Sequence, residues 1–461
     1  MQAAQWFILA PLALSPLNRY ADDMQLRYGD TSVACNISSE RIRSVLRAPL
    51  SPPESGPAAL IIEALDACDE ILSSFRPGER VVVVTSDITR YTGSEIYLPL
   101  LMDNLNHRGI RDQDITILIA LGIHRKQTDT EHRIIVGSLY NRITVIDHDC
   151  DNPNSLISLG NSSHGFEVQV NRLAIEADRL ILTGTIGFHY FAGFGGGRKS
   201  LLPGIGGRIS CLGSHFTVLH PIPGMGRHPL ATVGVLDGNP VHEALREACA
   251  LARPDLILNT VLAPDKRIIA VFAGEWDNAH RSGCRYYREH FSYPLTKAAD
   301  LVVASCGGYP KDINLIQAHK AMEYASRALK EGGVLILLAQ CQDGYGNPTF
   351  FKWFQYRELA DFETALRARY EINGQTAYAL LDKALRFRII LVSDLPSEEV
   401  RTMSLIPAVD LDEALEIASE LLPEDYTSYI IPEAGTVLPV VQPAHDKNMI
   451  HLEPDPSSTI I

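Results

Sequence analysis

Basic residues are the minority among the charged side chains of this 461-residue chain. Lysine and arginine number 41 against 55 aspartate and glutamate, which gives a formal net charge of −14 at pH 7. No basic stripe offsets this acidity, so we expect no nucleic-acid partner.

Closely paired cysteines are also missing. The eight cysteines are scattered along the chain, and no two of them form a C-x-x-C pair. Their spacing excludes a zinc ribbon and is typical of reduced thiols, so we expect a cytoplasmic protein.

The apolar stretch near the N-terminus does not have the features of a membrane span or a signal peptide. The run at 6–14 is too short to cross a bilayer, follows no lysine or arginine, and precedes no small-x-small cleavage site. We therefore expect no membrane partner, and we interpret residues 1–23 as a disordered or non-native extension.

What the chain does contain is a repeated order of buried strand, polar loop and helix. Hydrophobic runs typical of buried strands occur at 80–85, 114–120, 179–186 and 299–305. Their order predicts an α/β protein of two domains with mostly parallel sheets and an active site in the cleft between them. The predicted divisions are a first domain at 24–292, a second domain at 296–440 and a loose tail at 441–461.

A glycine-rich loop at 187–200 is the most unusual stretch of the sequence. Its residues read GFHYFAGFGGGRKS, and four glycines in five positions let the backbone approach a ligand closely. The loop is not a Walker A motif, because Arg198 stands where that motif requires glycine, and it is not a G-x-G-x-x-G dinucleotide loop. We predict that Gly196, Gly197 and Arg198 contact an anionic group. Lys199 is either a nucleophilic amine whose pKa the neighbouring cation lowers, or only a source of charge in a phosphate-binding loop.

Polar residues follow the other strands at the same predicted sheet edge. Asp87 and Arg90 come after the strand at 80–85, and His124 comes after the strand at 114–120. Each has an ordinary structural explanation, such as a local ion pair or a hydrogen-bonded histidine. Their matched placement after three strands, together with His189, nevertheless favours one shared site.

This set of residue types fits the recognition and inversion of a small acid. His124 and His189 are titratable groups on separate loops and could act as opposed general bases. Arg90, with Gln317 and Lys320 from the second domain, could bind a carboxylate. His215, sixteen residues after the loop lysine, would suit a soft or borderline metal.

The same segments resemble the lactate racemase family, whose members carry a nickel-pincer nucleotide. The similar segments are SDITR at 86–90, ALGIHR at 120–125, HYFAGFGGGRKS at 189–200, LPGI at 202–205, His215 and NLIQAHK at 314–320. The resemblance implies an isomerase, a racemase or epimerase that inverts the hydroxyl-bearing carbon of a small, lactate-like 2-hydroxy acid. It also implies reversible hydride transfer to the cofactor and partner enzymes that mature it, and it leaves the oligomeric state open.

The resemblance also implies a role for each matching residue. These roles are covalent attachment of the nucleotide through a thioamide (Lys199), the protein ligand of nickel (His215), the acid/base pair (His124, His189), substrate-carboxylate binding (Arg90, Gln317, Lys320) and support of the cofactor site (Asp87, Gly196, Gly197, Arg198).

Four positions depart from the family's usual residues without removing a catalytic group. They are Gly195, Tyr91, Ile123 and Ile316, where members typically have Ser, Pro, Thr and Tyr. Ile316 either packs against the helix core or lines the substrate pocket, and in the second case a larger, more apolar acid than lactate should fit. Two other functions stay compatible with the residues: a lysine-adduct or phosphate-binding enzyme without nickel, and a non-catalytic binding or cofactor-carrier protein.

Overall fold

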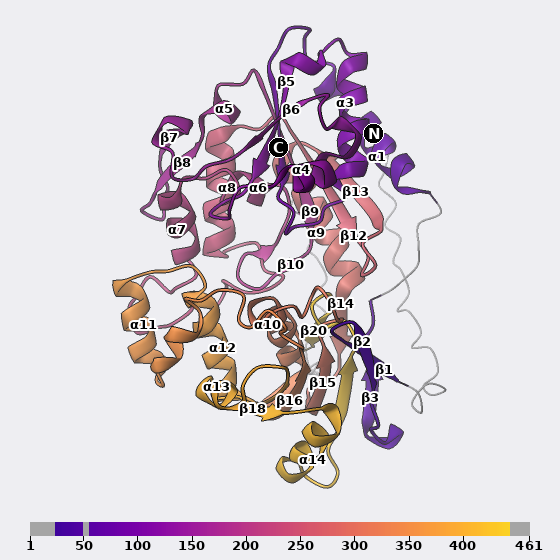
Figure 1. The fold of residues 1–461 in the computed structure, drawn as a ribbon, viewed down its shortest axis with the longest axis vertical. Helices are drawn as coiled ribbons and strands as arrows, with labels where there is room; N and C mark the ends of the chain where they lie inside the picture. Colours follow the sequence, from indigo (N-terminus) through magenta and orange to yellow (C-terminus); the bar gives the residue numbers. More distant parts are fainter. Residues whose placement is uncertain (1–23, 49–54, 443–461) are drawn as a thin grey trace, which may run out of the picture.

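The computed structural model describes residues 24–48 and 55–442. These residues form two α/β domains, one above the other in Figure 1, and each domain is built on a six-stranded sheet. The fold predicted from the sequence is therefore confirmed. The predicted extension at 1–23 and nearly all of the predicted tail at 441–461 lie outside the described residues.

The first domain contains the sheet β13-β12-β9-β4-β5-β6, in which every neighbouring pair is parallel except β12 and β13. The strands are β4 (Val81–Ser86), β5 (Ile115–Ala120), β6 (Thr144–Asp147), β9 (Arg179–Ile186), β12 (Leu256–Leu262) and β13 (Ile268–Gly274). Alternate residues of β4 pack into different cores, since Val81 and Val83 lie in one apolar cluster and Val82 and Val84 in another. This burial of both faces explains the unbroken run of valines.

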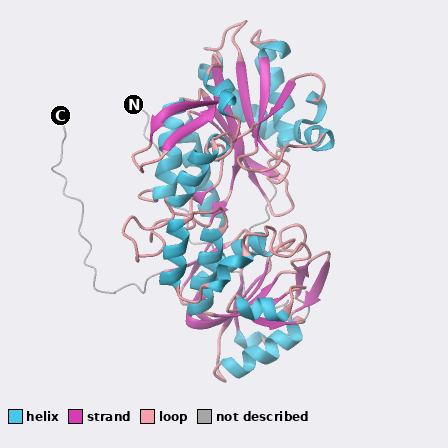
Figure 2. Cartoon of the chain, turned by 60° about the vertical axis from the view of Figure 1, so that its left-hand side comes forward, coloured by secondary structure: helices cyan, strands magenta, loops and turns pink. Residues whose placement is uncertain are grey.

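Helices cover both faces of this sheet, as Figure 2 shows from a second direction. The helices of one face are α1 (Pro57–Asp66), α3 (Ser94–His107) and α4 (Asp129–Val136); those of the other are α6 (Arg198–Leu201), α8 (Pro240–Ala252) and α9 (Trp276–Phe291). Helix α4 begins with a capping box, because Thr128 and Glu131 each accept a hydrogen bond from the other's backbone N–H.

The second domain contains the sheet β18-β17-β16-β15-β19-β3, in which all pairs are parallel. Its elements are β3 (Ile42–Val45), β15 (Ala299–Ser305), β16 (Leu329–Leu338), β17 (Arg388–Val392), β18 (Ile406–Ala408), β19 (Ser428–Ile431), and the helices α10 (Leu315–Ala325), α11 (Leu359–Ala368), α12 (Gly374–Arg386), α13 (Ser397–Thr402) and α14 (Leu411–Leu421). Helix α10 ends at Ala325, and the chain then enters β16 at Leu329, which pairs with Ala299.

The N-terminal segment belongs to the second sheet, although the predicted boundary at residue 24 assigns it to the first domain. Strand β3 pairs with β19, and the hairpin of β1 (Gln25–Tyr28) and β2 (Thr31–Ala34) places Leu26 in the core of the second domain. A pairing between strands almost four hundred residues apart has no local sequence signal. Strand β14 (Ser292–Leu295), at the predicted domain boundary, pairs with β20 (Leu438–Val441).

One apolar cluster continues from the first domain into the second. It joins Tyr190, Phe191 and Phe194 of the glycine-rich loop to Ala318 and Met322 of α10. The loop therefore lies at the boundary between the domains, where β10 (Phe188–His189) appears in Figure 1 above α10 and α12. Within the described residues, no helix is both long and apolar enough to span a membrane.

Candidate active site

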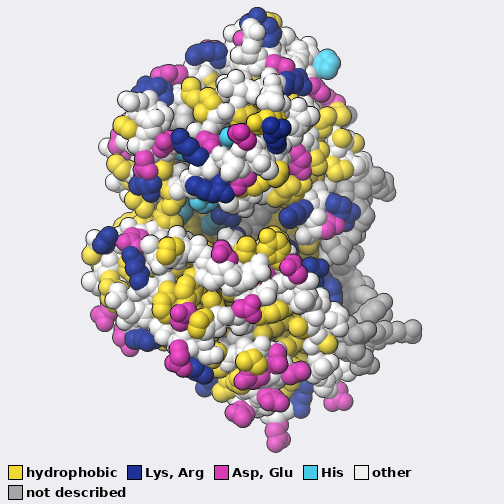
Figure 3. Space-filling model, viewed as in Figure 1, with side chains coloured by type: hydrophobic (Ala, Val, Ile, Leu, Met, Phe, Trp, Pro, Cys, Tyr) yellow, Lys and Arg dark blue, Asp and Glu magenta, His cyan; other side chains and the backbone are white. Residues whose placement is uncertain are grey.

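The predicted site residues come from loops at the carboxyl ends of adjacent parallel strands. Asp87 and Arg90 follow β4, His124 follows β5, and His189 and Lys199 follow β9. Figure 3 shows a hollow between the two domains in which histidine and basic side chains gather.

The glycines next to the lysine allow the loop to pack tightly on the sheet. A Cβ at Gly197 would lie 2.9 Å from Ile257, and a Cβ at Gly196, whose φ is +111°, would lie 2.8 Å from His280. The N–H of Gly197 donates to Asn259 Oδ1 at 2.7 Å. These contacts show close packing of the loop against β9, β12 and α9, and a cofactor contact of either glycine stays a prediction.

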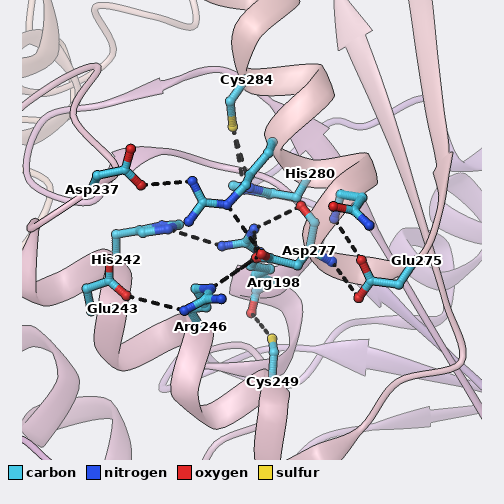
Figure 4. Close-up of polar contacts among 12 residues, drawn as sticks. Arg198, Asp237, His242, Glu243, Arg246, Cys249, Glu275, Asp277, His280 and Cys284 are labelled. Atoms are coloured by element: carbon cyan, nitrogen blue, oxygen red, sulfur yellow. Dashed lines mark hydrogen bonds and ion pairs between the residues drawn. The ribbon is translucent and has the colours of Figure 1, made fainter. Parts of the chain in front are cut away.

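Arg198 is buried behind the loop, and its predicted cofactor contact stays a prediction. The side chain is 1% exposed, and its guanidinium bonds Asp277 Oδ1 at 2.5 Å and His242 Nε2 at 3.2 Å, as Figure 4 shows. Behind the same loop, His280 Nε2 donates to the Gly195 carbonyl at 2.8 Å. Arg198 therefore anchors the lysine loop from behind.

Lys199 is half-buried, and the protein holds its amine in an unusual state. Burial, followed by the positive charge of Arg90, lowers the pKa of Lys199 to about 7. The cation responsible is thus Arg90 rather than the predicted Arg198. At neutral pH a large fraction of the amine is uncharged and nucleophilic.

Phe191, which the sequence analysis did not single out, lies at the centre of the site. Its ring centroid is 4.4 Å from that of His189 and 5.3 Å from that of His215, and it lies 5.5 Å from Lys199 Nζ. In the sequence, the only indication of its role is its position two residues after His189, in a loop rich in aromatics. The ring separates three polar groups and contributes to their desolvation.

His189 is kept neutral. Burial and then the charges of Lys199, Arg90 and Lys320 lower its pKa well below the ordinary histidine value. The N–H of Ala192 donates to His189 Nδ1 at 3.2 Å, so the neutral ring carries its proton on Nε2. In this arrangement the ring offers a hydrogen-bond donor at Nε2.

His124 has the opposite tautomer. Its Nδ1 donates to Asp87 Oδ2 at 2.6 Å, which leaves the lone pair of Nε2 free, and the side chain is 46% exposed. Asp87 is buried, and Thr89 donates to its other oxygen from both N (3.1 Å) and Oγ1 (2.7 Å). Burial acts to raise the pKa of Asp87, but the bonds from His124 and Thr89 outweigh it, so the net pKa is lowered.

Asp87 therefore orients His124, because both of its carboxylate oxygens already have protein partners. Its predicted role in the cofactor site stays a prediction.

His215 has the chemistry of a metal ligand. It lies on α7 (Arg208–Phe216), and its Nδ1 donates to the Cys211 carbonyl at 2.8 Å, so the lone pair is on Nε2. Burial and then the charge of Lys199 lower its pKa to about 4, which keeps the ring neutral. Among residues 24–48 and 55–442, no group of three or more histidine, cysteine, aspartate or glutamate side chains could hold a metal ion.

The second domain contributes Gln317 and Lys320 from α10. Lys320 Nζ donates to Gln317 Oε1 at 2.7 Å, and burial followed by the charges of Arg90 and Lys199 lowers the pKa of Lys320 to about 7. Arg90 thus contributes to the lowered pKa of both Lys199 and Lys320. Ile316 is half-buried and packs against the shared apolar cluster.

Known proteins are similar to this chain over nearly its whole length. Residues 28–226 match the lactate racemase N-terminal domain family and residues 295–439 the lactate racemase C-terminal domain family. The chain is 34% identical to lactate racemase from Thermoanaerobacterium thermosaccharolyticum over 430 residues, which cover 90% of this chain and 99% of the relative. It is also 34% identical to lactate racemase from Lactiplantibacillus plantarum over 363 residues, 76% of this chain and 82% of the relative.

Solved structures give the same result for the fold. The lactate racemase apoprotein from T. thermosaccharolyticum superposes with a TM-score of 0.82 at 32% identity, covering 91% of this chain and all of that one. A Thermotoga maritima protein shares the fold at a TM-score of 0.61 and 19% identity, covering 83% of this chain and 98% of that one. The family resemblance and the predicted enzyme class, a racemase-type isomerase, are confirmed: the chain belongs to the lactate racemase family.

Proposed function

We propose that this protein inverts the hydroxyl-bearing carbon of a small 2-hydroxy acid. Two of its relatives carry the name lactate racemase, which describes this reaction with lactate as the substrate. The observation that carries the proposal is the grouping of basic side chains, Arg90, Lys199 and Lys320, around the neutral ring of His189, whose pKa they help to lower. Such a site attracts an anionic substrate and keeps an uncharged imidazole beside it.

The residues present fit a lysine-tethered nickel-pincer nucleotide. The amine of Lys199 is partly uncharged at neutral pH, as covalent attachment requires, and His215 presents a free Nε2 lone pair to a metal. When bound, the group would supply a reversible acceptor for the hydride on the substrate Cα. The chain's own part is to hold that group and to exclude water with the ring of Phe191.

Substrate binding is assigned to both domains. Arg90 would pair with the substrate carboxylate from the first domain, and Lys320 and Gln317 would contact it from α10. Because these groups come from different domains, the substrate would be held between them.

Proton transfer is assigned to the two histidines, which are not equivalent. His124 is prepared as a base, because Asp87 holds the proton of the ring on Nδ1 and leaves Nε2 free. His189 presents Nε2–H, so it would first donate a hydrogen bond to the substrate. To take a proton from the opposite enantiomer, it must release the bond from the Ala192 N–H.

The proposal includes cofactor-maturation enzymes as partners and a cytoplasmic location. Support for reducing conditions comes from the cysteines, since all eight lie in the described segments, where they are buried and unpaired.

The test is enantiomer interconversion by protein produced together with the maturation enzymes and nickel. Chiral chromatography should show equilibration of a three- to five-carbon 2-hydroxy acid from either enantiomer. Lys199→Ala should abolish it, whereas Lys297→Ala, at an exposed lysine, should not. Protein with a covalent adduct on Lys199 that interconverts none of these acids would refute the proposal.

A further inference from the structure

Tyr190 joins the predicted catalytic loop to the second domain. It follows His189 in the first domain, and its hydroxyl lies 2.6 Å from Oγ1 of Thr376 on α12. The side chain is buried, so this hydrogen bond between the domains is made away from solvent. Two hydroxyls that bond each other in a buried site are costly to separate, because each would be left without a partner.

The backbone of Tyr190 is connected to the second domain through Arg227, a residue of the first domain. The carbonyl of Tyr190 accepts a hydrogen bond from Arg227 Nη2. Arg227 in turn pairs with the buried Glu323 at 3.1 Å, and Glu323 pairs with Lys383 at 2.8 Å. Both the side chain and the carbonyl of Tyr190 are therefore tied to α10 and α12.

The ring of Tyr190 lies between two histidines. On one side it stacks on His189, with centroids 5.4 Å apart and planes at 16°. On the other it meets the edge of His319 on α10 at 5.1 Å. His319 is fully buried, and neither of its ring nitrogens has a hydrogen-bond partner among the residues that the structure describes. Its ring therefore acts as a packing surface for Tyr190.

Helix α10 uses different positions for the two contacts. Gln317 and Lys320 are the predicted substrate-binding residues, whereas His319 and Glu323, one turn apart, hold Tyr190 and Arg227. The placement of Tyr190 thus determines how far His189 lies from the substrate-binding residues of the same helix.

We propose that Tyr190 is a positioning residue that, through its hydroxyl bond to Thr376, fixes His189 of the first domain relative to Gln317 and Lys320 of the second. The inference rests on the proposed function for its catalytic consequence. Its structural consequence, a fixed separation of the two domains, can be measured without any activity.

The structural test measures the distance between the domains by fluorescence energy transfer. Dyes can be attached at Ile209→Cys on α7 and Leu385→Cys on α12, because these side chains are 57% and 52% exposed while the native cysteines are buried. We expect a narrow distribution that broadens or shifts in Tyr190→Phe and in Thr376→Val. Thr376→Ser, which keeps the hydroxyl, should show the same narrow distance distribution as the wild type.

The catalytic test uses the loaded enzyme. Tyr190→Phe and Thr376→Val should each lower kcat/KM about five- to tenfold. The double variant should have a kcat/KM no lower than that of the less active single variant, because the two hydroxyls form one hydrogen bond. Tyr429→Phe is the matched control, since its buried hydroxyl donates to the Lys297 carbonyl within the second domain at 2.8 Å. It should lower the melting temperature without changing the distance or kcat/KM.

An unchanged distance distribution in both single variants would overturn the inference, whatever their activity. The inference would also be overturned if Thr376→Ser lost as much activity as Thr376→Val. Wild-type enzyme inactive on every 2-hydroxy acid would refute the proposed function alone, and the distance measurement would still decide the role of Tyr190.

Discussion

Replacing Asp87 with asparagine should remove most of the activity by reversing the hydrogen bond that orients His124. The N–H of Thr89 donates to Oδ1 at 3.1 Å, so in Asp87→Asn the amide oxygen must stay at that position. The NH₂ group then takes the place of Oδ2, which lies 2.6 Å from His124 Nδ1. Two donors cannot face each other, so neutral His124 must move its proton to Nε2 and loses its free lone pair.

The size of the loss follows from the role of a general base. Such groups contribute about 10²–10⁴-fold, and the corresponding change in a serine protease triad, which also enforces the wrong tautomer, lowers kcat about 10⁴-fold. His124 is 46% exposed, so its ring can partly escape by turning toward water. We therefore expect a loss of about 10²–10³-fold in kcat.

Asp87→Asn should also change the acid dependence of stability. The pKa of Asp87 is lower in the folded protein than its ordinary value of about 3.9. The folded state therefore binds fewer protons than the unfolded state near that pH, so the carboxylate stabilises the protein above it. This stabilisation is lost as the pH falls through the lower folded value. Urea unfolding at pH 7 should show a difference between wild type and variant that shrinks progressively as the pH is lowered below the ordinary carboxyl pKa.

The assay is the racemisation rate of enzyme with equal cofactor loading. Asp147→Asn is the matched control, because Asp147 bonds His132 Nε2 at 2.8 Å and accepts the Gln127 N–H at 2.8 Å in the same arrangement. Asp147→Asn should be less stable than wild type, but it should not show the rate loss of about 10²-fold or more that we expect for Asp87→Asn. Asp87→Asn with more than a tenth of wild-type kcat, or an equal loss in Asp147→Asn, would refute the reasoning.

Three further predictions concern the lysine, the metal ligand and the substrate. Amine labelling of Lys199 in apoprotein, followed by peptide mass spectrometry, should rise with a midpoint near pH 7 and shift upward in Arg90→Gln; a midpoint near that of a free lysine, about 10.4, would contradict the assigned environment. His215→Ala should lower bound nickel in a metal assay while the Lys199 adduct remains, and full nickel with full activity would exclude His215 as the ligand. Ile316 packs against the shared apolar cluster but is only half-buried, so its remaining surface is free to contact the substrate. On that basis it should favour four- and five-carbon aliphatic acids over lactate, with each buried methylene worth roughly 0.8 kcal/mol or fourfold in kcat/KM, and Ile316→Tyr should reverse the preference; a substrate panel led by lactate and unchanged by the substitution would exclude Ile316 from specificity.

Local pattern was sufficient to predict the strands β4, β5, β9 and β15 of the two sheets. The runs that became β4, β5 and β9 are apolar on both faces because both faces are buried, and this burial is visible in composition. Parallel strands also explain why Asp87 and His124, from consecutive loops, could be placed at one edge before their bond was known.

Contacts between distant segments could not be predicted in this way. The pairing of β3 with β19 depends on residues almost four hundred positions apart, and the partner of Arg198 is Asp277 on another helix. An arginine beside a reactive lysine has the same appearance in sequence whether it faces the site or the core. Phe191 was overlooked for a similar reason, since aromatic residues in a loop are usually packing residues.

The most direct test of the proposed function is racemisation of a 2-hydroxy acid that carries deuterium at Cα, with the loaded enzyme in ordinary water. Mass spectrometry of the separated product enantiomer gives the fraction of label retained. We expect slower reaction if C–H cleavage limits the rate, and most of the deuterium in the product, because the hydrogen leaves and returns within the site while His124 and His189 handle only the hydroxyl proton. Complete exchange of the label with solvent during inversion would contradict this account.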